Sequence, residues 1–382
     1  MNNPFRYGTE VSGYQFYDRK QPMDELYSIL SDGSSNVVLY APRRYGKTSM
    51  VLRVLERLRL DGFKCLMFNL SKVSSIERFM EEYTAAIYTL TCPMQNLGNR
   101  ISEYLAHLHP TFTFGGEGIC SIRFDYGPRM MTQAISDVLD LPEKIAEEMG
   151  VTLVVAFDEF QEISVLSKDL PLESLFRSCI QGHRHVRYVF FGSKTHMMRR
   201  MFGASSRPFY RSALNMKLGK PPVDESAEFL TSHFENEGLS VTGEEVRRII
   251  ELSENIPYFL QAIAALTFQS VTQRKSDAVE REDVENAARR LLEANEDLYE
   301  EMLRNLSGAQ RLLAAALANE PTKLFDEAYR QRHGLGVSST VHSALKKMEL
   351  EGLVESDKNA YFIGDPFFAH YIRQNRPAVV LG

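Results

Sequence analysis

Cysteine is scarce in this sequence. Its 382 residues include four cysteines, which lie far apart and form no Cys-x-x-Cys pair. Structural zinc sites usually show paired cysteines, and disulfide-stapled domains are cysteine-rich. The sequence therefore argues against both, and we expect reduced, buried thiols at Cys65, Cys92, Cys120 and Cys179.

Long apolar runs and low-complexity tracts are also missing. No stretch approaches the roughly 18 uncharged apolar residues of a membrane-spanning helix. The first residues, MNNPFRYGTE, lack the basic and apolar regions of a signal peptide, which predicts a cytoplasmic protein. Hydrophobic residues make up 44% and charged residues 25% of the chain, as in ordinary globular proteins. Disordered and collagen-like chains are thus excluded, and the length predicts two or three domains.

The net charge of −6 is unevenly distributed. Residues 223–304 carry a net charge of −11, residues 305–382 carry +1, and the first 222 residues carry +4. Because the acidity is confined to the middle of the chain, the total charge does not argue against a phosphate or nucleic-acid ligand elsewhere.

The first half alternates short β-rich runs with helical patterns, which is typical of an α/β fold with a parallel sheet covered by helices. The runs are continuously apolar and not alternating, as expected for strands buried on both faces. The predicted strands are residues 36–40, 64–69, 152–157, 187–191 and, more weakly, 214–218. Ser74 with Glu77 has the spacing of a capping box that opens a helix.

Three domains are predicted from the turn-forming residues that interrupt the helix and strand patterns. Residues 1–222 form the α/β core, with a β-hairpin inserted near 111–126 that either decorates the sheet edge or has a function. Residues 223–304 read as helical, with a capping box at Thr242 and Glu245. Residues 305–382 show helix patterns followed by strand, turn and strand, the plan of a winged helix-turn-helix.

The strongest motif is the segment APRRYGKTS at 41–49, between the first strand and a helix. It matches the phosphate-binding P-loop (Walker A) except that Ala41 replaces the usual first glycine. Backbone N–H groups from Arg43 to Thr48 can surround a phosphate at the positive end of the helix. Lys47 would neutralise phosphate oxygens, and the Thr48 hydroxyl would bind Mg²⁺. The predicted nucleotide-binding residues of the loop are Pro42, Arg43, Arg44, Tyr45, Gly46, Lys47, Thr48 and Ser49.

The second motif is the strand TLVVAFDE, which ends in Asp158 and Glu159. Beside a P-loop, Asp158 would hold Mg²⁺ and Glu159 would polarise the attacking water. Ser193, after the next strand, is the candidate polar residue between that strand and the γ-phosphate. Arg211 is the preferred candidate among several arginines for stabilising transition-state charge, in cis or from a neighbouring subunit.

Together these motifs resemble a known family. The segments APRRYGKTS, AFDEFQEI, FFGSKTHMMRRMF, NIPYFLQ and IGDPFFAHYI are similar to those of the archaeal-type predicted ATPases, P-loop proteins related to the AAA+ and STAND ATPases. The resemblance implies a P-loop core, a helical lid, a C-terminal winged helix and a preference for ATP. It also implies that Phe16 and Arg19 help to enclose the adenine and that Pro257 lies in the lid closing over the nucleotide.

The leading interpretation is a Mg²⁺-dependent ATPase whose nucleotide state, ATP or ADP, moves the lid and the winged helix. One alternative is a DNA-binding regulator gated by ATP, because the predicted recognition helix at 338–352 contains Lys346 and Lys347. The same helix also contains Glu349 and Glu351, so protein contact is an equal possibility. Another alternative is a STAND-like switch that hydrolyses ATP slowly and signals through protein contacts. Assembly into an oligomer stays open.

Overall fold

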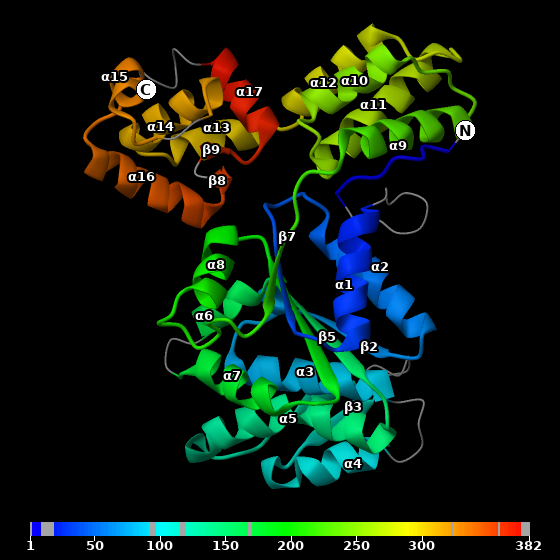
Figure 1. Cartoon of the computed structure of the whole chain (residues 1–382), viewed down its shortest axis with the longest axis vertical. Coiled ribbons are helices and arrows are strands. Elements are labelled where there is room, and N and C mark those ends of the chain that lie inside the picture. The colour runs from blue at the N-terminus through cyan, green and yellow to red at the C-terminus, as the bar shows by residue number, and fades with distance from the viewer. Residues whose placement is uncertain are drawn as a thin grey trace. The chain divides into compact units, whose positions relative to one another are not determined.

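The structure is a computed structural model that describes residues 2–8, 19–91, 97–114, 120–166, 170–321, 324–357 and 360–375 (Figure 1). The chain forms two compact units. The first, here called the sheet unit, comprises Lys20–Ala41 and Met50–Leu218. The second, the lid unit, comprises Met1–Arg19, Pro42–Ser49 and Gly219–Gly382. The division into domains at 222/223 and 304/305 stays a prediction.

The sheet unit is built on a five-stranded sheet in the order β2-β5-β6-β1-β7. All of its pairings are parallel, as predicted. Its strands agree with the predicted strands to within one residue at each end: β1 (Val37–Tyr40), β2 (Lys64–Asn69), β5 (Leu153–Asp158), β6 (Val186–Gly192) and β7 (Leu214–Lys217). Because the strands are parallel, the loops that leave their carboxyl ends share one edge of the sheet.

Both faces of the sheet are covered, which explains the continuous apolar runs. Alternate residues of β5, such as Val155 and Phe157, belong to the main hydrophobic cluster with α3 (Ile76–Thr91), α5 (Met131–Met149) and α7 (Leu172–Gly182). Figure 1 shows α1 (Lys20–Asp32) and α2 (Lys47–Leu60) on the other face. Shorter helices of the unit are α4 (Leu97–Tyr104), α6 (Ile163–Leu166) and α8 (Thr195–Gly203).

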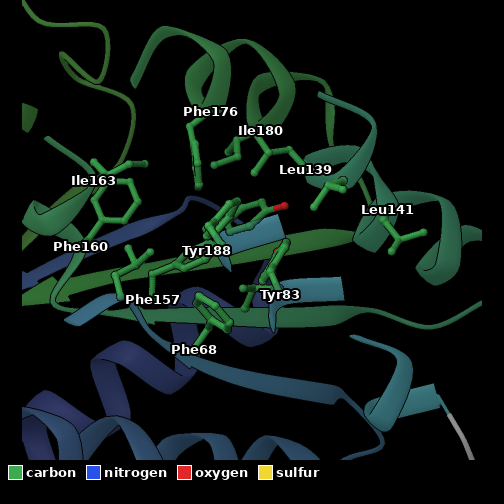
Figure 2. Packing of buried hydrophobic residues seen from close by; sticks show 14 of the residues in the cluster. Phe68, Tyr83, Leu139, Leu141, Phe157, Phe160, Ile163, Phe176, Ile180 and Tyr188 are labelled. Carbon is green, nitrogen blue, oxygen red and sulfur yellow. The ribbon is translucent and has the colours of Figure 1, made fainter. Parts of the chain in front are cut away.

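Aromatic rings pack in the core against β5 and the turn that follows it (Figure 2). The ring of Phe157 lies parallel to that of Tyr188, with centroids 6.2 Å apart. Phe160, in the 3₁₀ turn Phe160–Glu162, lies 4.5 Å from Phe190 and 5.3 Å from Phe209. Each such ring buries a large apolar area, so the turn after Asp158 is anchored in the core.

The inserted hairpin is present but does not extend the main sheet. β3 (Thr111–Phe114) and β4 (Cys120–Arg123) pair antiparallel and form a sheet of their own. The ring of Phe112 packs 5.5 Å from that of Tyr88 on α3. The hairpin therefore lies on a helix, not on the sheet edge as one reading expected; its turn falls outside the described residues.

Two serines are adjacent at the start of α3, and the capping residue is Ser75. Its Oγ accepts the Arg78 N–H at 3.2 Å, and its carbonyl accepts the Phe79 N–H. The predicted cap at Ser74 was one residue too early.

The segment that was predicted to be helical lies in the lid unit and contains α9 (Val223–Asn236), α10 (Gly243–Leu252), α11 (Pro257–Arg274) and α12 (Arg281–Glu293). α11 is buried on nearly all sides, from Phe259 to Phe268. The predicted capping box of Thr242 and Glu245 is present at α10. The N-terminal segment joins this unit, because Arg6 N–H donates to Gln261 Oε1 and Asn3 Nδ2 donates to Ala265 O.

The remainder of the lid unit has the predicted winged-helix plan. The helices are α13 (Glu296–Arg304), α14 (Gly308–Asn319), α15 (Glu327–Arg332), α16 (Ser338–Glu351) and α17 (Pro366–Gln374). β8 (Val354–Asp357) and β9 (Ala360–Ile363) form the antiparallel wing between α16 and α17. The predicted recognition helix is α16.

Cys65 and Cys179 are free thiols, and burial raises the pKa of each to about 11. Both thiols are therefore neutral near pH 7. Among the described helices, none combines the length and the apolar composition that crossing a membrane requires.

Candidate nucleotide site

The loop at 42–46 has the backbone expected of a phosphate-binding turn. It follows β1 directly and leads into α2, which begins at Lys47. Gly46 has φ +78°, a left-handed conformation that glycine adopts without strain, and Arg44 has φ +69°. A loop that ends at a helix N-terminus directs N–H groups and the positive end of the helix dipole toward an anion.

Lys47 lies folded over this loop. Its side chain is buried, with 6% of the residue exposed, and its ammonium donates to the carbonyl oxygen of Pro42 at 2.8 Å. Ser49 is buried and Thr48 half-buried in the first turn of α2. These three residues place one cation and two hydroxyls at the start of the helix, which is a donor set for a phosphate and a hard metal ion.

The acidic pair ends β5 as predicted. Asp158 is 5% exposed, and its Oδ1 accepts the Glu159 N–H at 2.8 Å. Its Oδ2 is 3.4 Å from Nδ2 of Asn69, the last residue of the neighbouring strand β2. Sequence analysis missed Asn69, although its position at the end of a predicted strand was a usable signal.

Glu159 and Ser193, both predicted catalytic residues, are in contact. Ser193 Oγ donates to Glu159 Oε1, and the Ser193 backbone N–H donates to Oε2 at 3.2 Å. Glu159 has φ +52°, uncommon for a residue other than glycine. The buried ring of Phe160 fixes the turn that carries it. β6 lies between β1 and β5 in the sheet, which is why Ser193 is beside this carboxylate.

Comparison with known proteins agrees with these features. Residues 16–263 match the family described as an ATPase domain predominantly from Archaea, and residues 297–374 match a probable winged helix domain. The chain belongs to this ATPase family. A comparison with curated protein sequences finds no match.

Solved structures share the fold of this archaeal-type ATPase at low sequence identity. The Walker-type ATPase PABY2304 of Pyrococcus abyssi is 17% identical with a TM-score of 0.66, over 97% of this chain and 99% of that one. The ORC2 protein of Aeropyrum pernix, in ADPNP and ADP complexes, is 15% identical with a TM-score of 0.55, over 95% and 94%. The ORC1 protein of the same organism, in complex with DNA, is 14% identical with a TM-score of 0.51, over 98% and 95%.

In this chain, Arg44 of the phosphate loop is bound by the first turn of α11 and by the residue that caps α17. Its guanidinium forms an ion pair with Asp365 and lies 5.0 Å from the ring of Tyr258 and 4.9 Å from that of Phe259. The Arg44 carbonyl accepts the Tyr258 N–H at 3.3 Å. Sequence analysis placed Arg44 near the nucleotide but missed Asp365.

Asp365 is the N-cap of α17. Its Oδ1 accepts the backbone N–H of Phe367 at 2.9 Å and of Phe368 at 3.1 Å. The hydroxyl of Tyr299, on α13, is 3.4 Å from both carboxylate oxygens. One carboxylate thus joins the phosphate loop to the start of α17 and to α13.

The residues expected near the adenine are only partly described. Phe16 lies outside the described residues. Arg19 is 4% exposed, and its guanidinium donates to the carbonyl oxygens of Tyr45 and Gly219, both at 2.7 Å. Arg19 therefore fixes the backbone of the phosphate loop. Burial, followed by the charges of nearby Glu355 and Glu254, raises the pKa of Tyr45 well above its ordinary value.

The remaining predicted residues occupy three places. Pro257 is the first residue of α11, next to the Tyr258 N–H that binds Arg44. Arg43 is exposed on the phosphate loop. Arg211 is exposed in the sheet unit, between α8 and β7, with its guanidinium 5.1 Å from the ring of Tyr210. Its role in transition-state stabilisation stays a prediction.

Proposed function

We propose that this chain binds ATP together with Mg²⁺ and hydrolyses it to ADP and phosphate. We further propose that its nucleotide state changes the position of the lid (223–304) and the winged helix (305–382). The observation that carries the proposal is that hydrogen bonds from Ser193 hold the carboxylate of Glu159 in place. It lies with Asp158 and Ser193 at the carboxyl ends of β5 and β6. The neighbouring strand β1 continues directly into the phosphate loop.

Each residue has a distinct role in this proposal. Backbone N–H groups of the loop bind the phosphates, and Lys47 neutralises their charge as its ammonium leaves the Pro42 carbonyl. Mg²⁺ usually keeps several waters and takes one or two protein ligands plus phosphate oxygens, so Thr48 and Asp158 suffice to hold it. The metal supplies charge stabilisation for the transferred group.

Glu159 accepts a hydrogen bond from the attacking water and orients it toward the γ-phosphate. Ser193 holds Glu159 and contributes its own N–H and hydroxyl dipoles at the same edge. Arg211 remains the candidate for stabilising the charge that develops. Catalysis of this kind relies on positioning and electrostatics and needs no covalent intermediate.

The Arg44–Asp365 ion pair supports the proposed coupling to the winged helix. A nucleotide phosphate would compete with Asp365 for the Arg44 guanidinium, because both are anions that arginine binds in the same geometry. Losing Arg44 would leave Asp365 with its α17 backbone donors and Tyr299. The nucleotide would thereby weaken the contact between the phosphate loop and the start of α17.

The hydrolysis proposal is tested by measuring ATP binding and steady-state phosphate release with Mg²⁺ and with EDTA. We expect micromolar binding with Mg²⁺, phosphate release that stops in EDTA, and ADP as the product. No binding of ATP would refute the proposal. Release of a single equivalent of phosphate followed by a stable ADP complex is the result expected of the STAND-like switch.

The coupling is tested by hydrogen–deuterium exchange with and without a non-hydrolysable ATP analogue. We expect faster exchange at the N-terminal turn of α17 when nucleotide is bound, because Asp365 loses one of its partners. Exchange in α5 of the sheet unit, which is distant in sequence from α17, serves as the internal reference. Equal exchange of α17 in both states would contradict the coupling.

DNA binding through α16 is the second candidate. The exposed residues of this helix include His342, Ser343, Lys346 and Lys347, while Val341, Leu345 and Met348 are buried. Lys347 also pairs with Glu351 at 4.0 Å, which reduces the charge offered to a phosphate backbone. The Aeropyrum ORC1 structure named above contains DNA.

Gel-shift titration of a random duplex at several salt concentrations tests this candidate. If α16 contacts DNA phosphates, affinity should fall steeply with salt, and the double variant Lys346→Glu, Lys347→Glu should abolish binding. The double variant Lys72→Glu, Lys275→Glu, at two exposed positions outside the winged helix, is a charge-matched control. DNA affinity that changes neither with the salt concentration nor with the charge reversal in α16 would exclude DNA binding through α16.

A further inference from the structure

Gln161 is a fully buried polar residue beside Glu159, and the mechanism above gives it no role. It is 0% exposed and lies in the 3₁₀ turn that follows the acidic pair. Its Nε2 donates to Glu159 Oε2 and lies 3.4 Å from Glu162 Oε1. Its Oε1 is buried without a hydrogen-bond partner among the described residues.

An apolar residue would be the expected occupant of this position. Its neighbours Phe160 and Ile163 are both buried in the hydrophobic cluster. A buried amide with one unbonded polar atom costs about 1–3 kcal/mol. Packing therefore does not explain the amide, whereas the hydrogen bond to Glu159 does.

We propose that Gln161 is a positioning residue for Glu159 in ATP hydrolysis; this inference rests on the proposed function. Gln161 and Ser193 together direct three donors at the carboxylate: the Gln161 amide, the Ser193 hydroxyl and the Ser193 backbone N–H. Three donors from two elements fix the orientation of the carboxylate, so that it can accept a hydrogen bond from the attacking water.

Gly192 makes room for this arrangement. A Cβ at position 192 would lie 1.9 Å from Gln161 Oε1 and 3.0 Å from its Cδ. The backbone φ of Gly192 is not left-handed, so alanine is tolerated by the main chain. The substitution Gly192→Ala would consequently displace the Gln161 amide without removing it.

The test compares Gln161→Met, Gly192→Ala and the control Gln310→Met for kcat, for the Kd of ATP and for thermal stability. Gln310 is also a buried glutamine, 2% exposed, but caps α14 in the winged helix. We expect Gln161→Met to lower kcat about 10-fold or more, since losing a supporting contact typically costs 10–100-fold. The Kd should stay within about twofold. Gly192→Ala should act in the same direction, and Gln310→Met should leave kcat unchanged.

A double-mutant cycle with Glu159→Gln separates positioning from a merely structural role. In the Glu159→Gln background, Gln161→Met should change the residual kcat less than about twofold, because the group it positions is gone. An equal loss in both backgrounds would overturn the inference. Gly192→Ala, which keeps the amide, takes the place of Gln161→Met if that variant does not fold.

The remaining outcomes distinguish this inference from the proposed function. A wild-type protein that hydrolyses ATP while Gln161→Met and Gly192→Ala keep full kcat overturns the inference alone. A wild-type protein that binds ATP without hydrolysing it overturns the hydrolysis proposal and the inference with it.

Discussion

The phosphate loop and the acidic edge of the sheet hold their charged side chains in different ways. The acidic edge is the pair Asp158 and Glu159 at the carboxyl end of β5. In the lid unit, Arg44 is bound by Asp365 and by the rings of Tyr258 and Phe259, which are more than 200 residues away in sequence. In the sheet unit, Glu159 is bound by Gln161 and Ser193, from its own turn and from the adjacent strand. The Arg44 guanidinium is thus held by residues far away in sequence, whereas the Glu159 carboxylate is held by residues of its own turn and of the adjacent strand end.

This difference separates two tasks. A carboxylate held by neighbours within one packed core keeps its geometry when other parts of the chain move, as catalysis by positioning requires. A cation held by a remote carboxylate changes partner when an anion arrives, so its binding can report nucleotide state. We propose that Glu159 is held for chemistry and that Arg44 is held for communication.

The largest effect should come from Lys47→Ala. The loop loses its phosphate cation, so the Kd of ATP should rise about 100-fold, the equivalent of a strong charged hydrogen bond. Titration calorimetry measures the change, with the exposed Lys72→Ala as control. Unchanged affinity would remove the loop from the site.

Glu159→Gln should affect turnover and spare binding. The amide cannot act as a base, so kcat should fall by about 10²–10⁴-fold while the Kd of ATP stays within about twofold. Phosphate release in single- and multiple-turnover assays checks this, against Glu147→Gln on the exposed face of α5. A variant that hydrolyses at the wild-type rate would exclude Glu159 as the base.

Asp365→Asn should remove the effect of nucleotide binding on α17 and should leave the fold nearly intact. Asparagine can still cap α17, but it no longer neutralises Arg44. ATP should then bind a few-fold more tightly, and nucleotide should no longer change hydrogen exchange at α17. Asp326→Asn, at the cap of α15, is the matched control. Weaker ATP binding, or an undiminished exchange response, would argue against competition for Arg44.

The smallest effect concerns the contact between Asp140 on α5 and His183, the residue that follows α7. The hydrogen bond from His183 lowers the pKa of Asp140 despite partial burial. A lowered pKa means that Asp140 stabilises the fold fully above its ordinary pKa of 3.8 and loses this contribution as pH falls through the folded-state value.

Asp140→Asn should therefore lower the free energy of unfolding at pH 7 by on the order of 0.5 kcal/mol, because the side chain is partly exposed and solvent screens it. Urea denaturation from pH 7 to pH 2 measures the difference, which should shrink in acid. The exposed Glu147→Gln on the same helix should show no such dependence. A difference that grows on acidification would reverse the assignment.

The features that were predicted from the sequence are those that depend on residues close together in the chain. The strands were found because burial on both faces requires continuous apolar runs, and the phosphate loop because its glycine, lysine and threonine stand at fixed spacing. Asp158 and Glu159 followed from their position after a strand, and the contact of Glu159 with Ser193 confirms that the two strand ends are adjacent.

The features that were missed depend on packing between distant residues or on a choice between equivalent neighbours. Asp365 lies 321 residues from Arg44, and no local pattern links the two. Gln161 was not among the predicted site residues, and its burial arises from Phe160 entering the core. Ser74 and Ser75 offer the same capping chemistry, so only the backbone decides between them.

The central claim is that the phosphate loop and the acidic edge act on one nucleotide and its metal. Nucleotide-dependent binding of Mn²⁺, used in place of Mg²⁺ and followed by electron paramagnetic resonance, tests it with Thr48→Ala, Asp158→Asn and the double variant. The account predicts that each single substitution weakens Mn²⁺–ATP binding about 10-fold or more and that the double variant adds little, because both ligands hold the same ion. Fully additive losses, or no loss from either substitution, would contradict it.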